Sequence, residues 1–334
     1  MRKNLAVALL LVAPLAAQQK KIVATGLGAS LIPELQKAAP NVTFVIGDVK
    51  SPTGLVAQVA DADAILGTIS PELFRAAKKL KWVHIFSAGV ENYRFPEFIN
   101  SDVALTNARI IQGPEIADHA FAFLLALTRG LYRAIPDRTK EEWGRGAYQA
   151  IELRGKTALI IGVGGIGQQI AMRAWAFGMN VIGVDPKDYP LSNYATRIVP
   201  PDRIDTVLPL ADVVFVSAPH TPESEGMVGP RQFERMKKGA YFVAVSRGKL
   251  YNSEALVKAL DEKRLAGAGL DVTNPEPLPK GHALWKFENV VITPHVATVS
   301  DGLPARQREL IVDNVARFVK GEPMRNVVDK KKGY

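Results

Sequence analysis

Short apolar runs alternate with longer amphipathic segments along most of this chain. Runs such as 21–25, 42–46 and 213–217 are rich in valine, isoleucine and alanine and have the length of buried β-strands. The segments between them have helical spacing, as in 71–79, where Pro71 suits the first turn of a helix. Strands that alternate with helices predict parallel sheets covered by helices on both faces.

A long apolar segment separates two sets of predicted strands. The first set ends near residue 86, and the second begins at Thr157. Residues 110–135, which lie between the two sets, are predicted to form one long helix because the segment is mostly apolar over that length. The polar segment at 137–149 predicts a second helix or a connector.

The pattern predicts an α/β fold with two doubly wound parallel-sheet domains, one inserted in the other. The amphipathic segment 303–320 predicts a helix that returns to the first sheet, which would otherwise lack a covering layer. The first domain then comprises 21–109 and 298–328, and the second comprises 110–297.

Composition and charge narrow the functional classes. The chain has 334 residues, of which 47% are hydrophobic and 22% charged, as in ordinary globular proteins. Its net charge of +9 is dispersed, and the short run Lys330–Lys332 is predicted to be a solvated tail. No nucleic-acid partner is therefore expected. The positive excess favours small anionic substrates and cofactors.

The chain contains no cysteine, which excludes disulfides, thiol catalysis and cysteine-bound zinc. None of its five histidines has the spacing of paired metal ligands, so no metal site is predicted.

A glycine-rich turn follows the predicted strand 157–161. Gly162 suits the tight turn, Gly164 lets backbone N–H groups approach a pyrophosphate, and Gly167 lets the following helix pack on the strand. Asp185, at the end of the next strand, is placed to accept hydrogen bonds from an adenosine ribose and would repel a 2′-phosphate. The motif predicts a site for NAD rather than NADP; the alternative is an ordinary strand–turn–helix unit.

Three later strand ends carry residues that suit the reduction of a 2-keto acid. Arg247 can grip a carboxylate and polarise a carbonyl, and His295 can give a proton to the oxygen as hydride reaches carbon. Glu276 can orient that histidine and favour its protonated form. Each has a structural alternative: a surface ion pair for the arginine, a solvated loop residue for the glutamate and a packed residue for the histidine.

These motifs together resemble the D-isomer-specific 2-hydroxyacid dehydrogenases. The resemblance runs from about Lys21 to Val328 and rests on motifs in a fixed order: Gly162–Gly167, Pro219–Ser224, Met236–Ala240, Ser246–Gly248, Leu270–Pro277 and Thr293–His295. It implies a Rossmann cofactor domain inserted in a flavodoxin-like substrate domain. It also implies a homodimer and the catalytic set Arg247, Glu276 and His295.

The resemblance assigns further roles at the expected site. Gly165 and Ile166 would meet the pyrophosphate, and the cofactor wall would include Ala218, Val245, Ser246 and Asp271. The substrate carboxylate would be held by Arg247 and by the backbone N–H groups of Ala88, Gly89 and Val90.

Two local departures from the family pattern stand out. Gly165 occupies a position where the family often has arginine, so one phosphate contact is expected to be missing. Tyr251 and Asn252 stand where the family commonly has valine and aspartate. Neither change touches the expected catalytic set.

The sequence therefore predicts an NAD-dependent oxidoreductase that acts on the CH–OH group of donors. Its expected reaction is reversible hydride transfer between nicotinamide and a small 2-keto or 2-hydroxy acid. One alternative is a glyoxylate or hydroxypyruvate reductase that uses NADPH. Another is a non-catalytic NAD-sensing protein, which would not need the complete catalytic set.

The first 17 residues have the pattern of a secretory signal peptide. A basic start, 1–4, precedes the apolar run 5–17, which is too short to span a bilayer and ends in small residues. The alternative is a first strand or helix. The leader indicates export, whereas the family is usually cytoplasmic, so the localisation stays open; no stable membrane span is predicted.

Overall fold

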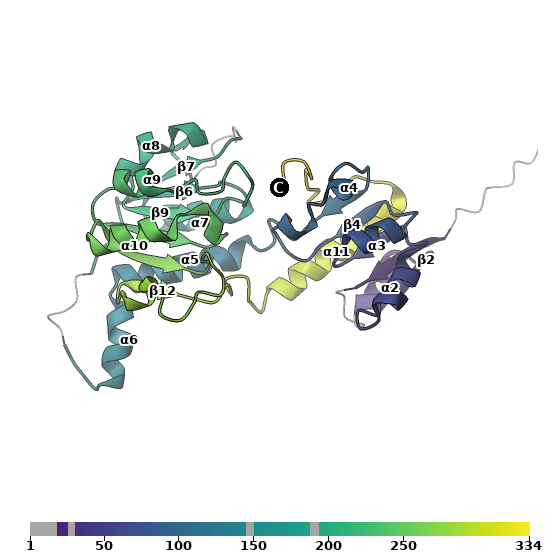
Figure 1. Ribbon diagram of the computed structural model, residues 1–334, viewed down its shortest axis with the longest axis horizontal. Coiled ribbons are helices and arrows are strands. Elements are labelled where there is room, and N and C mark those ends of the chain that lie inside the picture. The colour runs from purple at the N-terminus through teal and green to yellow at the C-terminus, as the bar shows by residue number, and fades with distance from the viewer. Residues whose placement is uncertain (1–18, 26–30, 145–149, 188–193) are drawn as a thin grey trace, which may run out of the picture.

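The computed structural model describes residues 19–25, 31–144, 150–187 and 194–334. Two parallel sheets lie at the centres of two lobes that are placed side by side (Figure 1). The predicted leader, 1–17, lies outside the described residues.

The first lobe is built on a sheet of five parallel strands in the order β2-β1-β3-β4-β5. Its strands are β1 (Lys20–Ala24), β2 (Val42–Ile46), β3 (Ala64–Leu66), β4 (Trp82–His84) and β5 (Ala104–Thr106). Its helices are α1 (Ile32–Ala38), α2 (Pro52–Val59), α3 (Pro71–Ala76), α4 (Pro96–Ile99) and α11 (Leu303–Lys320).

Alternate residues of β1 face opposite sides of this sheet, as the two-residue period of a strand requires. Val23 packs with Leu55 of α2 in one core cluster. Ile22 packs in another with Ile311 and Val315 of α11. The C-terminal helix therefore covers one face of a sheet whose strands are formed by residues 20–106.

The second lobe is built on a sheet of seven parallel strands in the order β12-β11-β10-β9-β6-β7-β8. Its strands are β6 (Thr157–Ile161), β7 (Asn180–Val184), β8 (Arg197–Val199), β9 (Val213–Val216), β10 (Ala240–Ala244), β11 (Leu265–Leu270) and β12 (Val290–Ile292). Its helices are α5 (Gly113–Thr128), α6 (Leu131–Thr139), α7 (Gly165–Ala176), α8 (Ile204–Val207), α9 (Pro230–Arg235) and α10 (Ser253–Asp261).

Helices cover both faces of the seven-stranded sheet. Ile160 of β6 packs in the cluster that contains α5 and α7. Leu159 packs in the cluster that contains α8, α9 and α10. These two parallel sheets with helical layers confirm the predicted fold class.

The prediction of one helix over 110–135 is wrong. The segment forms α5 and then α6, which are separated by Gly130 in the left-handed conformation (φ 72°). Glycine adopts this conformation without steric cost and ends a helix there. No residue of α6 is buried, and this helix projects from the second lobe in Figure 1.

Two connections join the lobes: residues 107–112, between β5 and α5, and residues 293–302, between β12 and α11. Within the described ranges, no helix combines the length and the apolar character needed to cross a membrane.

Candidate active site

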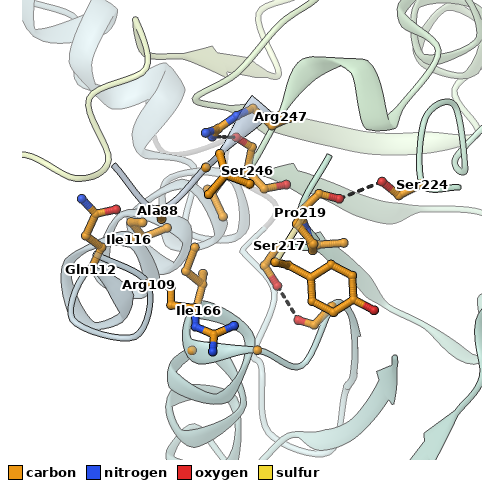
Figure 2. Close-up of a pocket in the computed structure, with 18 of the residues that line it drawn as sticks. Ala88, Arg109, Gln112, Ile116, Ile166, Ser217, Pro219, Ser224, Ser246 and Arg247 are labelled. Atoms are coloured by element: carbon orange, nitrogen blue, oxygen red, sulfur yellow. Dashed lines mark hydrogen bonds between the residues drawn. The ribbon is translucent and has the colours of Figure 1, made fainter. Parts of the chain in front are cut away.

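A cavity of about 1490 Å³ lies between the two lobes. Its wall includes the loop 86–91, which follows β4, and the turn 162–166, which follows β6. Residues that follow β9 and β10 form much of the remaining cavity wall. Figure 2 shows residues of both lobes and of the connection 107–112 around it, among them Ala88, Arg109 and Arg247. The carboxyl ends of parallel strands are where ligands bind in open α/β sheets.

The glycine turn is built for close backbone approach. Gly162 has φ +88°, and a side chain there would lie 2.5 Å from the Cα of Ala218. A side chain at Gly167 would collide with the carbonyl oxygen of Gly162. A Cβ added at Gly164, by contrast, meets nothing within 4 Å. The turn thus leaves open space in front of the first turn of α7, whose N–H groups have no partners within the helix.

Gly165 is constrained by the connection between the lobes. A Cβ on this residue would lie 2.6 Å from the Cα of Ile110, a residue with φ +75°. Any side chain at this position, arginine included, would require the connection to move. The departure from the family pattern at Gly165 therefore has a steric explanation in this chain.

Asp185 lies directly after β7 and faces the cavity. Its carboxylate accepts hydrogen bonds from the N–H groups of Val163 (2.8 Å) and Lys187 (2.9 Å), which fixes it beside the glycine turn. A carboxylate has about four lone-pair sites, so capacity remains for the hydroxyls of a ribose. The glycine turn, the helix N-terminus and this acid fit a dinucleotide.

Arg247 follows β10 and reaches from the second lobe to the first. Its Nε donates to Oε1 of Glu91 (2.8 Å), and its Nη1 donates to the carbonyl oxygen of Ser246 (2.7 Å). The backbone at Gly89 lies so close that a Cβ there would collide with the guanidinium. The arginine is thus held against the loop that carries Ala88, Gly89 and Val90.

That loop presents backbone donors at the cavity. The carbonyl oxygens of Ala88 and Gly89 accept hydrogen bonds from Asn107 (2.6 Å) and Ser87 (2.7 Å). Among the described residues, no protein acceptor pairs with the N–H groups of Ala88, Gly89 and Val90. Because these residues line the cavity, their N–H groups can serve an anionic ligand.

His295 and Glu276 form a close pair at the second lobe. His295 Nδ1 lies 2.7 Å from Oε1 of Glu276, and each side chain is 38% exposed. A carboxylate can only accept, so Nδ1 carries the proton and Nε2 is left for another partner. His295 lines the cavity and Glu276 lies outside the lining. This is the arrangement of a proton-transferring imidazole oriented by a carboxylate.

Asp271 holds the backbone that carries His295. The buried Asp271 accepts hydrogen bonds from the Thr293 hydroxyl (2.6 Å) and from the N–H groups of Val296 (2.9 Å) and Ala297 (3.0 Å). The N–H of His295 donates to the carbonyl oxygen of Asp271 (2.9 Å). These bonds fix a residue that has the unusual φ of +56°.

Most residues proposed from sequence line this one cavity: Ala88, Gly89, Val90, Gly162, Gly164, Gly165, Ile166, Asp185, Ala218, Val245, Ser246, Arg247, Asp271 and His295. Glu276 and Gly167 lie outside the lining and act through a neighbour, His295 and the glycine turn respectively.

Comparisons with known proteins agree with this geometry. Residues 121–297 match the model of the D-isomer specific 2-hydroxyacid dehydrogenase, NAD binding domain. The chain is 34% identical to a glyoxylate reductase of Korarchaeum cryptofilum, over 83% of this chain and 86% of that protein. It is also 34% identical to a D-3-phosphoglycerate dehydrogenase of Archaeoglobus fulgidus, over 78% of this chain but 49% of that longer protein.

A solved structure extends the similarity to the whole architecture. A D-lactate dehydrogenase from Aquifex aeolicus, complexed with NAD and lactic acid, superimposes with a TM-score of 0.74 at 26% identity. The similarity covers 90% of this chain and 96% of that chain. The chain belongs to the D-isomer specific 2-hydroxyacid dehydrogenase family. Membership confirms the predicted family, the enzyme class acting on CH–OH donors and the NAD cofactor.

Several residues at the cavity or next to it were not predicted from the sequence. Glu91 holds Arg247, although only its loop was singled out. His119 of α5 lies outside the cavity lining, but its Nε2 is 2.9 Å from the Thr293 hydroxyl that also binds Asp271. Lys187 and Tyr334 also line the cavity. No sequence signal marks these roles, because each depends on a contact between distant segments.

Proposed function

We propose that the chain reversibly transfers hydride between NAD and C2 of a small D-2-hydroxy or 2-keto acid. The observation that carries the proposal is the His295–Glu276 pair, at 2.7 Å, on the cavity that Arg247 and the glycine turn also line. A titratable imidazole, a guanidinium and a dinucleotide cradle are the components this reaction needs.

The proposed roles follow from the chemistry of each group. Arg247 and the free N–H groups of 88–90 bind the substrate carboxylate and orient its keto group. During reduction, His295 donates a proton from Nε2 to the keto oxygen, and it takes the proton back during oxidation. Glu276 fixes the ring through Nδ1 and stabilises the imidazolium. The bound nicotinamide would supply or accept the hydride.

The proposed cofactor residues are those that surround the glycine turn. Gly162 and 164–167 receive the pyrophosphate, and Asp185 receives the ribose hydroxyls. Ala218, Val245, Ser246 and Asp271 complete the wall. Since Asp185 is fixed as an acceptor and would repel a 2′-phosphate, NADH is expected to bind better than NADPH.

The main test is the substitution His295→Gln. Loss of general acid catalysis is expected to lower kcat for reduction by about 10²–10⁴-fold, while the Kd for NADH, followed by nucleotide fluorescence, stays close to that of the wild type. If the wild type binds NADH tightly but turns over no 2-keto acid, the proposed enzymatic activity is contradicted and an NAD-sensing role is supported.

A glyoxylate or hydroxypyruvate reductase that uses NADPH is a second candidate. The identity with the Korarchaeum glyoxylate reductase favours a small substrate of this kind. A panel of 2-keto acids with NADH and with NADPH, followed by the loss of nucleotide absorbance, separates the candidates. Higher kcat/KM with NADPH than with NADH would contradict the role of Asp185.

We also propose the domain boundaries 21–109 with 298–328, and 110–297. They are supported by the covering of the first sheet by α11 and by the two connections between the lobes. Limited proteolysis of the folded protein is expected to cut first in the connections. Equally rapid cleavage within β6 or β10 would contradict these boundaries.

We further propose that residues 1–17 are an export signal. The support is their pattern, a basic start and a short apolar run closed by small residues. N-terminal sequencing of the mature protein is expected to find cleavage near Ala17. Retention of Met1 in protein recovered from the native cell would contradict the proposal.

A further inference from the structure

The segment 329–334, which follows α11, is fastened to the first lobe. Lys330 Nζ donates to the carbonyl oxygens of Phe98 (2.8 Å), Ser101 (2.7 Å) and Val103 (2.7 Å). It also lies 4.7 Å from the centroid of the Phe98 ring. Burial lowers the pKa of Lys330 from its ordinary value. The expectation of a solvated tail is therefore wrong at this lysine.

A second set of contacts gives the segment a defined turn. Arg94 Nη2 donates to the carbonyl oxygen of Lys331 (2.8 Å) and packs against the buried Gly333. The N–H of Gly333 donates to the carbonyl oxygen of Asp329 (2.7 Å), and the N–H of Asp329 donates to that of Tyr334 (3.2 Å). The segment is thus held on the first lobe at two points and closed on itself.

The other side of this segment faces the cofactor cavity of the second lobe. Lys331, Lys332, Gly333 and Tyr334 line the same cavity as Asp185. Lys187 Nζ, two residues beyond that acid, lies 4.8 Å from the centroid of the Tyr334 ring. In Figure 1 the C-terminal end lies between the two lobes. The segment therefore bridges the first lobe and the edge of the site where the ribose is expected.

We propose that residues 329–334 form a strap that completes the cofactor site at its adenosine end, with the Tyr334 ring as a contact surface for the adenosine. The inference rests on the dinucleotide site proposed above. The cavity of about 1490 Å³ exists with the strap in place, and it exceeds the roughly 300–1,000 Å³ of ordinary ligand pockets. The strap therefore forms a wall of the site and does not fill it.

Charge and chemistry support the adenosine end as the ligand. Lys187, Lys331 and Lys332 line the cavity, and their positive charge suits an anionic dinucleotide. An aromatic ring gives a purine base a surface on which to stack. The strap, which is held on the first lobe, would thus add positive charge and an aromatic surface to the cofactor site of the second lobe.

The test is the substitution Tyr334→Ala in the full chain. We expect the Kd for NADH, measured by fluorescence titration, to rise about tenfold from the loss of stacking. The effect is expected in KM for NADH rather than in kcat. Reduced nicotinamide mononucleotide, which lacks the adenosine, is expected to react equally well with both proteins. Tyr334→Phe, which keeps the ring, is expected to restore most of the affinity.

Two further variants separate this role from a structural one. Lys330→Met loosens the strap from the first lobe and is expected to weaken NADH binding in the same direction as Tyr334→Ala. Trp285→Ala removes a half-exposed aromatic ring outside the cavity lining and serves as the matched control. Thermal unfolding of each variant checks that the fold is intact.

The possible outcomes are distinct. Unchanged or tighter NADH binding by Tyr334→Ala would overturn the proposed role of the strap. Removal of a ring that merely blocks the site should lower the Kd for NADH. An equally large loss of reaction with reduced nicotinamide mononucleotide in Tyr334→Ala would also overturn the proposal. If the wild type itself binds no NADH, the dinucleotide site fails before the strap is examined.

Discussion

Single glycines decide whether the cofactor site can form, and two of them do so for different reasons. A Cβ at Gly164 points into open space at the cavity, whereas a Cβ at Gly167 collides with the carbonyl oxygen of Gly162. The first glycine therefore serves the ligand and the second serves the packing of α7 on β6. The same motif thus contains a functional position and a structural one.

The paired substitutions Gly164→Ala and Gly167→Ala test this distinction. Gly164→Ala is expected to keep the thermal midpoint and to weaken NADH binding at least about tenfold, because the added methyl group occupies space meant for the pyrophosphate. Gly167→Ala is expected to destabilise the fold by about 1–3 kcal/mol through overpacking. Thermal unfolding and NADH titration of both proteins measure the two effects. If both variants change equally in thermal stability and in NADH affinity, the distinction between a functional and a structural glycine is contradicted.

At the residue scale, the sequence could predict groups that directly follow apolar strands. Arg247 and His295 were found because β10 and β12 are short apolar runs whose carboxyl ends meet at one edge of a sheet. Glu91 could not be found in this way, since it bonds Arg247 across 156 positions of sequence. Its role depends on how the two lobes face one another, and the periodicity of apolar residues carries no information on that arrangement.

At the element scale, apolar runs predicted most strands but missed the three-residue strands β5 and β8, and they predicted helix ends poorly. The apolar pattern of 110–135 continues through Gly130, so the break between α5 and α6 is visible only in the backbone conformation.

Local hydrogen bonds explain the departures from the family pattern at Tyr251 and Asn252. The Tyr251 hydroxyl donates to the carbonyl oxygen of Val272 (2.8 Å), and Asn252 caps α10 through the N–H of Ala255 (2.7 Å).

Strand β4 carries a buried histidine that makes stability depend on pH. His84 is 1% exposed, its Nδ1 lies 2.8 Å from the Thr106 hydroxyl, and burial lowers its pKa from 6.5 to about 4. The unfolded chain therefore takes up a proton below pH 6.5 that the folded chain refuses until about pH 4. The free energy of unfolding should fall by about 3 kcal/mol as the pH drops through this window.

The substitution His84→Gln is expected to flatten this pH dependence. The thermal midpoint of each protein, measured by calorimetry from pH 7 to pH 4, gives the slope. Other groups titrate in both proteins, so the difference between the two slopes isolates His84. The same slope in wild type and variant would show that burial of this imidazole does not control acid stability.

At the scale of the whole molecule, both lobes contribute to one site, and the second lobe has a projecting arm with exposed apolar side chains. We propose that this arm, α6 with residues 140–144, pairs two copies of the chain. Its large apolar side chains are exposed: Leu131 by 47%, Ile135 by 62% and Trp143 by 88%. Apolar side chains of this size are costly to leave in water, and a second copy of the chain would cover them.

The substitution Ile135→Asp tests the proposed homodimer. A charge placed in an apolar interface is expected to shift the sedimentation of the protein toward the 36.3 kDa of one chain. Val49→Asp is the matched control, because Val49 is equally exposed (61%) but lies in the first lobe between β2 and α2. It should leave the assembly intact. Since α6 lies outside the cavity lining, NADH should still bind the dissociated chain. A wild-type protein that sediments as one chain, or equal dissociation by both variants, would contradict a dimer formed through this arm.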